Sequence, residues 1–531
     1  MRLNISYKKY LFLYLLIVSF TGVIRVNAQN FNQDLQKLQL AYKLVSTFYV
    51  DSVDNEKLVE DAIVGMLKNL DPHSEYLSKE EVKKLNEPLD GGFEGVGVQF
   101  NIMDDTLMVV SPISGGPSEK VGILAGDRII FIDDENVAGI GLTNSGVKDR
   151  LKGKKGTKVK LKILRKGYSK LLDFTVERDK IPIYSVEATY MATKDVGYVK
   201  INQFSATTHK EFETALKTLN SQGMKNLILD LRGNPGGYLK AAIDVVDEFL
   251  EEDKVIVYTE GLTNPRREYR SSNGGLFKTG KVVVLINEGS ASASEIVSGA
   301  VQDWDRGIIL GRRSFGKGLV QRPLNLQDGS MIKLTIAKYY TPSGRCIQKP
   351  YDKGADAYRK EIYTRDILHS EDSVAADLPT YQTRTSNRLV YGGGGIKPDI
   401  FIAADTSGYS DYYRDIVALG VLNRFVLAYL DESRDMLSIK YDSYDEFLKK
   451  YEVGENMINQ LVEEAKKEKI TSDTKGLEVS LHLLKTQIKA LIARNLWGVS
   501  EYFQTINPIS EEFNKAIEVL SSEKSYTGLL N

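Results

Sequence analysis

The segment VVVLINEGSASASEIVSGAVQDW, from Val282 to Trp304, determines the fold of the middle of this chain. It opens with an apolar run of β-branched residues, which is typical of a strand buried on both faces. Gly289 and small residues then form a turn. From about Ala293 the apolar residues recur at helical spacing, which we interpret as core packing: Ile296, Val297, Ala300, Val301 and Trp304. A buried strand, a turn and an amphipathic helix predict an α/β layer.

The same alternation of strands and helices extends over residues 181–403. VGYVKINQF reads as a strand and is followed by an amphipathic stretch from Thr208 to Leu219. NLILDLRGN is a short apolar run typical of a buried strand, and a helix is expected from Tyr238 to Leu250. We therefore predict one α/β core domain over residues 181–403.

Residues 91–180 have a different texture, with short strands separated by glycines. Two strings stand out, GVGV at residues 95–98 and GGPSEKVGILAGDRIIFIDDENV at residues 115–137. Together and at this distance they resemble a PDZ domain. The resemblance implies that the backbone N–H groups of Val96, Gly97 and Val98 bind the terminal carboxylate of a peptide, which adds as an extra strand. Because Val96 and Val98 would line the pocket, we expect small or apolar last residues.

Helical patterns flank these two domains. Residues 29–90 have helical spacing interrupted at Pro72, and residues 404–531 read as a C-terminal helical domain. The chain is therefore predicted to be a multidomain α+β protein. The helical end domains are candidate homodimer surfaces.

Residues 1–28 have the pattern of a secretory signal peptide. Basic residues precede the apolar run LFLYLLIVSF, and Val26 and Ala28 offer small side chains before a cut after Ala28. The alternative is an uncleaved membrane anchor, although the run is short for a span. We expect an exported protein on the periplasmic or extracellular side of the membrane.

Composition limits the possible partners and cofactors. The 531 residues carry a formal net charge of −1, and without the four basic residues of the signal peptide the charge becomes −5, so nothing indicates a nucleic-acid partner. Cys346 is the single cysteine, which rules out an intrachain disulfide and a cysteine-based zinc site. We expect no metal or other cofactor.

Three serines compete for a chemical role at the turn after the buried strand: Ser290, Ser292 and Ser294. A hydroxyl there lies beside the unpaired N–H groups and the positive end of the helix dipole, which favours a developing negative charge. The structural alternative is that the serines cap the helix.

A second unusual string is GRRSFGKGLVQ, from Gly311 to Gln321. It nearly matches a phosphate-binding loop, but Gly318 stands where that loop needs a hydroxyl to hold magnesium. The following LVQRPLNL does not open as a helix, so the anion would lack its helix N-terminus. Nucleotide binding is therefore not expected, and Lys317 needs another role.

Several strings in order and spacing resemble the carboxyl-terminal processing, or tail-specific, serine proteases. Lys317 follows Ser292 by 25 residues, and the matching strings are NEGSASASE, FGKGLVQ, LDLRGNPGGYL and LDPHSEYL, with the PDZ domain before the core. The resemblance implies a core of the Clp protease and crotonase type. It also implies that Ser292 is the nucleophile, Lys317 the general base and Gln321 the residue that orients the lysine. Asp303 occupies an acidic position of the family, for which we expect a salt-bridged structural role.

The implied chemistry is physically reasonable. A lysine has an ordinary pKa of about 10.4, and burial lowers it so that the neutral amine can take a proton. Phe315, Leu319 and Val320 would supply apolar surroundings. In a strand that begins at Lys317, residues 317, 319 and 321 share a face, so the Gln321 amide can orient the lysine without adding negative charge.

Two tasks remain: an alternative proton acceptor, and the donors to the oxyanion. The chain has four histidines, His73, His209, His369 and His482, of which His73 is the alternative base, with a hydrogen-bonded structural role as the other reading. The oxyanion needs two donors. Ala293, directly after the nucleophile, should supply one, and Gly237 or its neighbour Gly236 the other, with Gly237 preferred.

The sequence thus predicts a serine endopeptidase that recognises the C-terminus of protein substrates through its PDZ domain and cuts in their C-terminal region. Its partners would be proteins or peptides with free C-termini, and an adaptor could deliver them. Two alternatives belong to other classes: a non-catalytic peptide-binding scaffold, and a crotonase-type acyl-CoA enzyme. Intact Ser292, Lys317 and Gln321 argue against the scaffold, and the signal peptide argues against coenzyme A chemistry.

Overall fold

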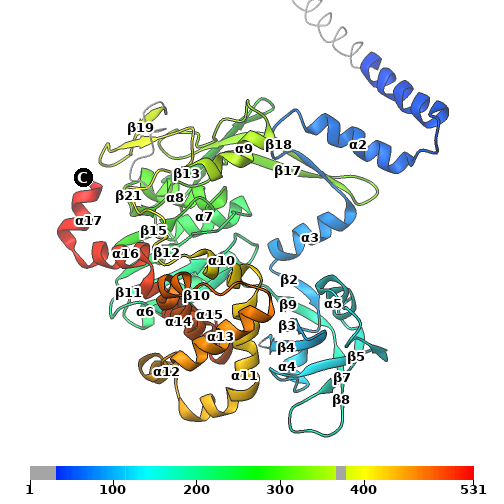
Figure 1. Ribbon diagram of the computed structural model, residues 1–531. Helices are drawn as coiled ribbons and strands as arrows, with labels where there is room; N and C mark the ends of the chain where they lie inside the picture. Colours follow the sequence, from blue (N-terminus) through cyan, green and yellow to red (C-terminus); the bar gives the residue numbers. More distant parts are fainter. Residues whose placement is uncertain (1–31, 114, 366–377) are drawn as a thin grey trace, which may run out of the picture.

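A computed structural model describes residues 32–113, 115–365 and 378–531 (Figure 1). The predicted signal peptide, residues 1–28, lies outside the described residues. No helix in the described ranges combines the length and the apolar character that a membrane crossing requires. The N-terminal helices, PDZ domain, α/β core and C-terminal helical region confirm the predicted architecture.

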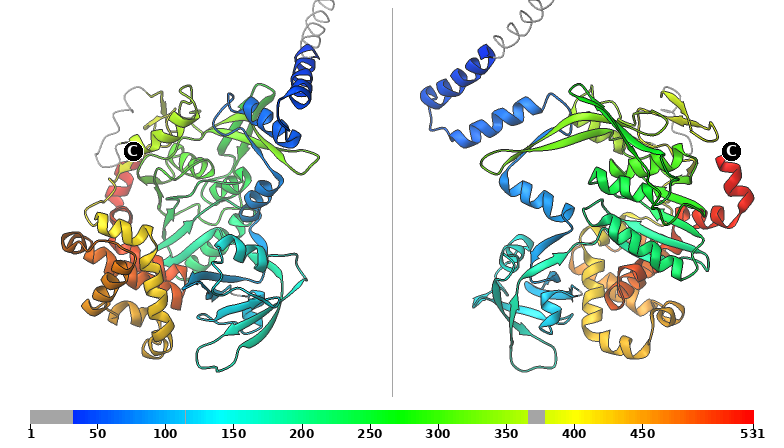
Figure 2. Two further views of the ribbon diagram at one scale, coloured as in Figure 1. Left: turned by 45° about the vertical axis from the view of Figure 1, so that its right-hand side comes forward. Right: turned by 180° about the vertical axis from the view of Figure 1, so that it is seen from behind.

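The N-terminal region contains a helix over residues 32–48, α2 (Asn55–Leu67) and α3 (Lys79–Leu89). Asp54 caps α2 by accepting two backbone N–H groups, and Ser78 forms a capping box at α3. Figures 1 and 2 show the helix over residues 32–48 and α2 standing away from the body of the molecule.

The helical region predicted for residues 29–90 also contains one strand that was not predicted. Strand β1 (Glu75–Leu77) lies between α2 and α3 and pairs antiparallel with β18 (Met331–Tyr340) of the core. Tyr76 pairs with Ile332 in this register. The N-terminal region is thus joined to the core by main-chain hydrogen bonds.

The PDZ domain is built on an antiparallel sheet with strand order β3-β4-β5-β7-β8. A separate pair, β2 with β9, connects it to the flanking chain. The sheet closes over a core of buried aliphatic residues, among them Ile129 and Val159. Its elements are β2 (Gly92–Gly95), β3 (Val98–Met103), β4 (Thr106–Pro112), α4 (Pro117–Lys120), β5 (Arg128–Ile132), β6 (Glu135–Asn136), α5 (Asn144–Leu151), β7 (Lys158–Leu164), β8 (Leu172–Glu177) and β9 (Asp179–Pro182).

The core domain contains a six-stranded sheet of order β10-β11-β12-β15-β16-β21, parallel except for β10. Helices α6, α7 and α8 cover one face. The strands and helices are β10 (Val186–Met191), β11 (Val196–Ile201), α6 (Thr208–Ser221), β12 (Asn226–Asp230), α7 (Leu239–Asp247), β15 (Val282–Ile286), α8 (Ala293–Asp303), β16 (Ile308–Gly311) and β21 (Ile400–Phe401).

The opposite face of this sheet is covered by the end of the chain. Val284 packs under α6–α8, whereas its neighbour Val283 packs against Phe513 and Leu520 of the last helices, as period-2 alternation requires. The last helices α16 (Glu511–Ser521) and α17 (Glu523–Leu530) therefore form the second layer over the sheet, although they follow the C-terminal helical region in sequence (Figure 1).

A second sheet, of order β1-β18-β13-β14 with β17 also paired to β18, carries the lysine loop at its edge. Its other strands are β13 (Val255–Gly261), β14 (Asn264–Arg270) and β17 (Leu319–Asn325). The chain then forms α9 (Ala355–Lys360), η1 (Glu361–Thr364), β19 (Thr380–Gln382) and β20 (Leu389–Tyr391).

The C-terminal helical region has its own core, rich in tyrosine and phenylalanine. Its helix α11 contacts the PDZ domain, where Arg128 of β5 forms an ion pair of 2.8 Å with Asp431. The elements are α10 (Asp411–Ala418), α11 (Val421–Lys440), α12 (Tyr444–Lys450), α13 (Glu455–Lys467), α14 (Thr474–Leu496), α15 (Val499–Ile506) and η3 (Asn507–Ile509).

Candidate active site

Ser292 lies at the junction between β15 and α8, in a backbone conformation that few non-glycine residues adopt. Its φ is +56° and its ψ is −110°. Such strain persists only where the surroundings enforce it, and it is commonest at functional positions. Ser290 and Ser294 are fully buried and donate to carbonyl oxygens of neighbouring loops, at 2.8 and 2.9 Å. Ser292 is half-buried, so it is the serine of this trio that solvent reaches.

The GNPGG loop after β12 packs directly on this turn. A Cβ on Gly236 would lie 2.8 Å from Ser292 Cβ, so only glycine permits this approach. The Gly236 N–H donates to the buried Asn234 side chain at 2.9 Å. In contrast, no described residue accepts a hydrogen bond from the N–H of Gly237 or of Ala293. Ala293 directly follows Ser292 and Gly237 directly follows Gly236, so both donors belong to the two segments that meet at this turn.

Lys317 lies in the loop before β17, and side chains of distant elements hold its backbone. Glu295 of α8 accepts the N–H groups of both Ser292 and Lys317 on the same oxygen, at 2.8 and 2.9 Å. The Tyr339 hydroxyl lies 2.5 Å from the carbonyl oxygen of Lys317 and 3.1 Å from that of Ser292. The serine and the lysine are therefore tied together through their main chains.

The environment of the Lys317 side chain favours its neutral form. Burial, assisted by the nearby cation of Lys333, lowers the pKa of Lys317 to about 8. No described residue forms a hydrogen bond or an ion pair with its Nζ. Leu319 is buried and the Phe315 ring packs edge-on against Tyr358, so the predicted apolar setting is present around this loop.

Gln321 lies in β17, but this strand differs from the predicted one that begins at Lys317. The strand begins at Leu319, not at Lys317, and its pairing with β18 skips Ile336. A bulge of this kind interrupts the simple alternation of faces. The Gln321 amide nitrogen donates to the Thr335 hydroxyl at 3.2 Å, which leaves the amide oxygen without a described partner.

The alternative base, His73, lies near the same lysine. Its Nε2 is 2.9 Å from the Tyr358 hydroxyl. Burial, reinforced by the charge of Lys317, lowers the pKa of His73 to about 3. The ring is therefore neutral at pH 7 and a weak proton acceptor. These contacts agree with the hydrogen-bonded structural role.

Asp303 has the structural role expected for it. Its carboxylate pairs with Arg345 at 2.7 Å, and both side chains are fully buried. It also accepts the Ser343 N–H at 2.8 Å. The expectation of a salt-bridged aspartate is confirmed.

Sequence reasoning missed four residues that support the lysine loop: Glu295, Tyr339, Thr335 and Asp71. Thr335 donates to Asp71 at 3.0 Å and accepts from Gln321, which extends the amide's support into the N-terminal region. Asp71 stands in the string LDPHSEYL and could have been noticed there. Tyr339 lies in an ordinary strand sequence and gave no signal.

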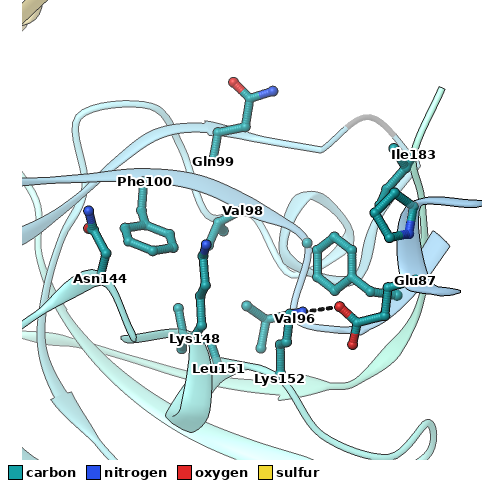
Figure 3. A pocket seen from close by; sticks show the side chains of 13 residues that line it. Glu87, Val96, Val98, Gln99, Phe100, Asn144, Lys148, Leu151, Lys152 and Ile183 are labelled. Atoms are coloured by element: carbon teal, nitrogen blue, oxygen red, sulfur yellow. Dashed lines mark hydrogen bonds and ion pairs between the residues drawn. The ribbon is translucent and has the colours of Figure 1, made fainter. Parts of the chain in front are cut away.

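The PDZ domain has a groove of about 530 Å³ between β3 and α5 (Figure 3). Val96, Gly97 and Val98 line it, together with Leu151 of α5. Gly97 has a φ of +76°, which turns the backbone at this point. Because β3 is an edge strand of the sheet, it can accept an added peptide strand.

One end of the groove is bordered by residues outside the PDZ domain. Glu87 of α3 forms an ion pair with Lys152, which follows α5, and Figure 3 shows this pair at the groove. The Lys152 cation also lies 4.9 Å from the centre of the Phe93 ring, just before the GVGV loop. A positive side chain is therefore held beside the loop that was predicted to bind a carboxylate.

Four family models match this chain. Residues 195–354 match peptidase family S41, and residues 95–177 match the PDZ domain. Residues 22–81 match the N-terminal domain of the activating protease CtpB. Residues 412–498, in the C-terminal helical region, match a family of unknown function, DUF8443.

Curated relatives extend over most of the chain. It is 39% identical to the carboxy-terminal processing protease CtpB of Bacillus subtilis over 67% of this chain and 75% of the relative. It is 40% identical to a carboxy-terminal-processing protease of Bartonella bacilliformis, over 63% of this chain and 77% of the relative. It is 38% identical to CtpA of Bacillus subtilis, over 61% and 68%. The chain thus belongs to peptidase family S41, as a carboxy-terminal processing serine protease with a PDZ domain.

Proposed function

We propose that this protease uses a Ser292–Lys317 dyad to cleave proteins whose free C-termini bind its PDZ domain. The observation that carries the proposal is the main-chain link between the two residues through Glu295 and Tyr339. It joins a strained serine to a lysine whose pKa is lowered to about 8. At pH 7 roughly one such lysine in ten is neutral.

The reaction follows from these groups. Neutral Lys317 takes the proton of the Ser292 hydroxyl while Oγ bonds to the carbonyl carbon of the scissile peptide. The N–H groups of Gly237 and Ala293, free of described acceptors, stabilise the oxyanion. The lysine ammonium returns its proton to the departing amine, and water then releases the acyl group from Ser292 by the same two steps. The Gln321 amide oxygen orients the lysine.

Substrate selection is assigned to the PDZ groove. The terminal carboxylate of a peptide would accept backbone N–H groups of Val96, Gly97 and Val98, and Lys152 adds a positive charge nearby. The last side chain would enter the apolar part of the groove beside Leu151. This favours substrates that end in small or apolar residues.

The test uses the purified protein and an unfolded reporter that ends in Ala-Ala. Wild type is compared with Ser292→Ala and Lys317→Ala, and the reporter is used with its carboxylate free and amidated. Cleavage that is lost in both variants and weakened by amidation supports the proposal. Full activity of Lys317→Ala would reject the lysine as base, and cleavage indifferent to amidation would reject tail recognition. Cleavage that requires an added cell fraction would indicate an adaptor.

Self-association is proposed for the projecting N-terminal arm, residues 32–67. Apolar side chains on it are exposed, including Leu38 at 45% and Phe48 at 76%. A second copy of the chain could cover them. Analytical ultracentrifugation should detect a dimer that Leu38→Glu with Phe48→Glu dissociates, and a monomeric wild type would reject it.

Export is proposed from the pattern of residues 1–28. Cell fractionation and N-terminal sequencing should find a mature chain that begins after Ala28 outside the cytoplasm. An intact N-terminus in the membrane fraction would favour an anchor.

A further inference from the structure

Two side chains, Glu295 and Tyr339, connect the backbones of Ser292 and Lys317, and we call this pair the bracket. Glu295 Oε2 accepts both N–H groups, and Tyr339 Oη lies within hydrogen-bond distance of both carbonyl oxygens. The N–H group and the carbonyl oxygen of both Ser292 and Lys317 thus lie within hydrogen-bond distance of the same pair of side chains. The separation of the two Cα positions cannot change without breaking hydrogen bonds.

Glu295 does more than cap its helix. It stands at the third position of α8, where a glutamate commonly accepts the N-cap N–H. However, only one of its four hydrogen bonds is of this kind. The other three come from the lysine loop, from the Ser314 hydroxyl at 2.5 Å, the Gly316 N–H at 2.7 Å and the Lys317 N–H.

These four donors favour an ionised carboxylate. Burial raises the pKa of Glu295 above its ordinary value, but three of the four partners are N–H groups, which cannot accept a hydrogen bond from a protonated carboxyl and therefore favour the carboxylate. The side chain is fully buried, and a buried carboxylate is stable only with such complete hydrogen bonding. Its amide analogue cannot reproduce this pattern, because an NH2 group would face N–H donors.

Tyr339 contributes a single polar atom from an otherwise apolar position. Its ring belongs to the main core of the protease domain and is 1% exposed. Burial raises the pKa of Tyr339 well above its usual range, so the hydroxyl keeps its proton. Replacement by phenylalanine would therefore remove the bracket's hydroxyl and leave the packing intact.

We propose that Glu295 and Tyr339 are positioning residues that set the distance between the nucleophile and the general base. They touch no substrate and act through the backbones of Ser292 and Lys317. This inference rests on the proposed dyad. A displacement of about 1 Å between reacting groups lowers rates by about 100-fold, so loss of either residue should reduce the chemical step and leave substrate binding nearly unchanged.

The test measures serine activation directly, by the rate at which a fluorophosphonate probe labels the full-length protein. Wild type is expected to be labelled, whereas Ser292→Ala and Lys317→Ala are not. Tyr339→Phe should be labelled about 10- to 100-fold more slowly, with kcat on the reporter reduced in parallel and KM changed less than about 3-fold. Glu295→Gln should lose more activity than Tyr339→Phe, because its NH2 group cannot accept the two hydrogen bonds made to one carboxylate oxygen and faces those donors instead.

A matched control is Tyr190→Phe. Tyr190 of β10 is also buried, and its hydroxyl accepts from Asn507 at 2.7 Å in the core on the other side of the six-stranded sheet, away from Tyr339. Both tyrosine variants should lose similar stability in thermal unfolding, but Tyr190→Phe should keep the wild-type labelling rate. If Glu295→Gln does not fold, Tyr339→Phe decides alone.

The outcomes separate the two proposals. Labelling of Lys317→Ala at the wild-type rate would reject the dyad. If the dyad variants behave as expected but Tyr339→Phe is labelled within about 2-fold of the control, the positioning role is wrong and the bracket serves stability alone.

Discussion

His73 and Tyr358 share a hydrogen bond of 2.9 Å across 285 residues of sequence. The contact connects the N-terminal string LDPHSEYL to the segment that covers the lysine loop, because the Tyr358 hydroxyl also lies 3.4 Å from the Gly316 carbonyl oxygen. His73 and Tyr358 thus belong to the residues that pack against the lysine loop, and we call them the wall behind Lys317.

The first prediction concerns acid stability. The pKa of His73 is about 3 in the folded protein and about 6.5 when unfolded, so the unfolded chain binds more protons below pH 6.5. Stability is therefore lost as the pH falls from about 6.5 toward 3, by at most about 1.4 kcal/mol per pH unit from this group. Calorimetry of His73→Gln should show a smaller decrease in Tm on acidification than wild type. An unchanged decrease would show that His73 titrates normally.

The second prediction concerns the pH dependence of catalysis. If Lys317 acts as a neutral base with a pKa of about 8, kcat should rise with pH and level off above that value. The cation of Lys333 helps to lower this pKa and also pairs with Glu75 at 2.9 Å. Lys333→Met removes the cation and frees the carboxylate, so the rise should move to higher pH. A pH–rate profile that does not move, or moves to lower pH, would contradict this account.

The third prediction separates structural from catalytic roles in α8. Asp303→Asn leaves Arg345 buried without its charge partner, which should destabilise the protein by about 3–5 kcal/mol. Denaturant unfolding would measure this loss, with Asp305→Asn as a milder comparison, because its partner Arg388 keeps a second ion pair with Asp399. At temperatures where Asp303→Asn is folded, the probe-labelling rate should stay close to wild type. A folded variant with an unreactive serine would argue for a catalytic aspartate.

The fourth prediction addresses the groove of the PDZ domain. Glu87 pairs with Lys152 and so reduces the positive field beside the carboxylate loop. Glu87→Gln should tighten binding of a peptide with a free C-terminus by about 2- to 5-fold at low salt, and the gain should shrink as salt is added. Glu80→Gln, at an exposed position of the same helix, is the control. Isothermal titration with an amidated peptide should show no gain; an equal gain would mean that Lys152 does not sense the carboxylate.

The fifth prediction concerns the contact between the PDZ domain and α11. The Arg128–Asp431 pair is partly buried, with side chains 32% and 19% exposed, and the Lys166 ammonium donates to the Asp431 carbonyl oxygen at 3.2 Å. Arg128→Asp and Asp431→Arg should each loosen the contact, and the double swap should restore it by about 1 kcal/mol. Hydrogen exchange in α11 would report the loosening. Additive effects in the double variant would mean that the pair does not hold the domains.

The sequence alone was informative where a short stretch of residues limits the local backbone geometry. The glycines of GVGV and GNPGG and the serine turn could be singled out because a tight turn or a close approach restricts residue choice locally, whereas the roles of Ser292 and Lys317 came from the family resemblance and stay predictions. The α/β order followed from buried apolar runs that alternate with amphipathic helices. Such signals need no knowledge of distant contacts.

The missing parts depend on contacts between distant segments. Strand β1 has three residues, too few for a period-2 signal, and it exists because β18 pairs with it. Glu295 reads as an ordinary capping residue until the lysine loop is folded against it. Tyr339 has no distinguishing neighbours in sequence, so its hydroxyl could not be assigned to the site.

The pairing of β1 with β18 affects when the site can form during synthesis of the chain. Asp71 accepts a hydrogen bond from Thr335, which lies 264 residues later in the sequence. Strand β1 pairs with β18, which is synthesised much later. A ribosome adds about 5–20 residues per second, so the wall behind the lysine stays unfinished for roughly a quarter of a minute or more after residue 71 emerges. During that interval the nascent chain lacks a complete site. The site therefore cannot be complete before β18 is made, when nearly two thirds of the chain exists.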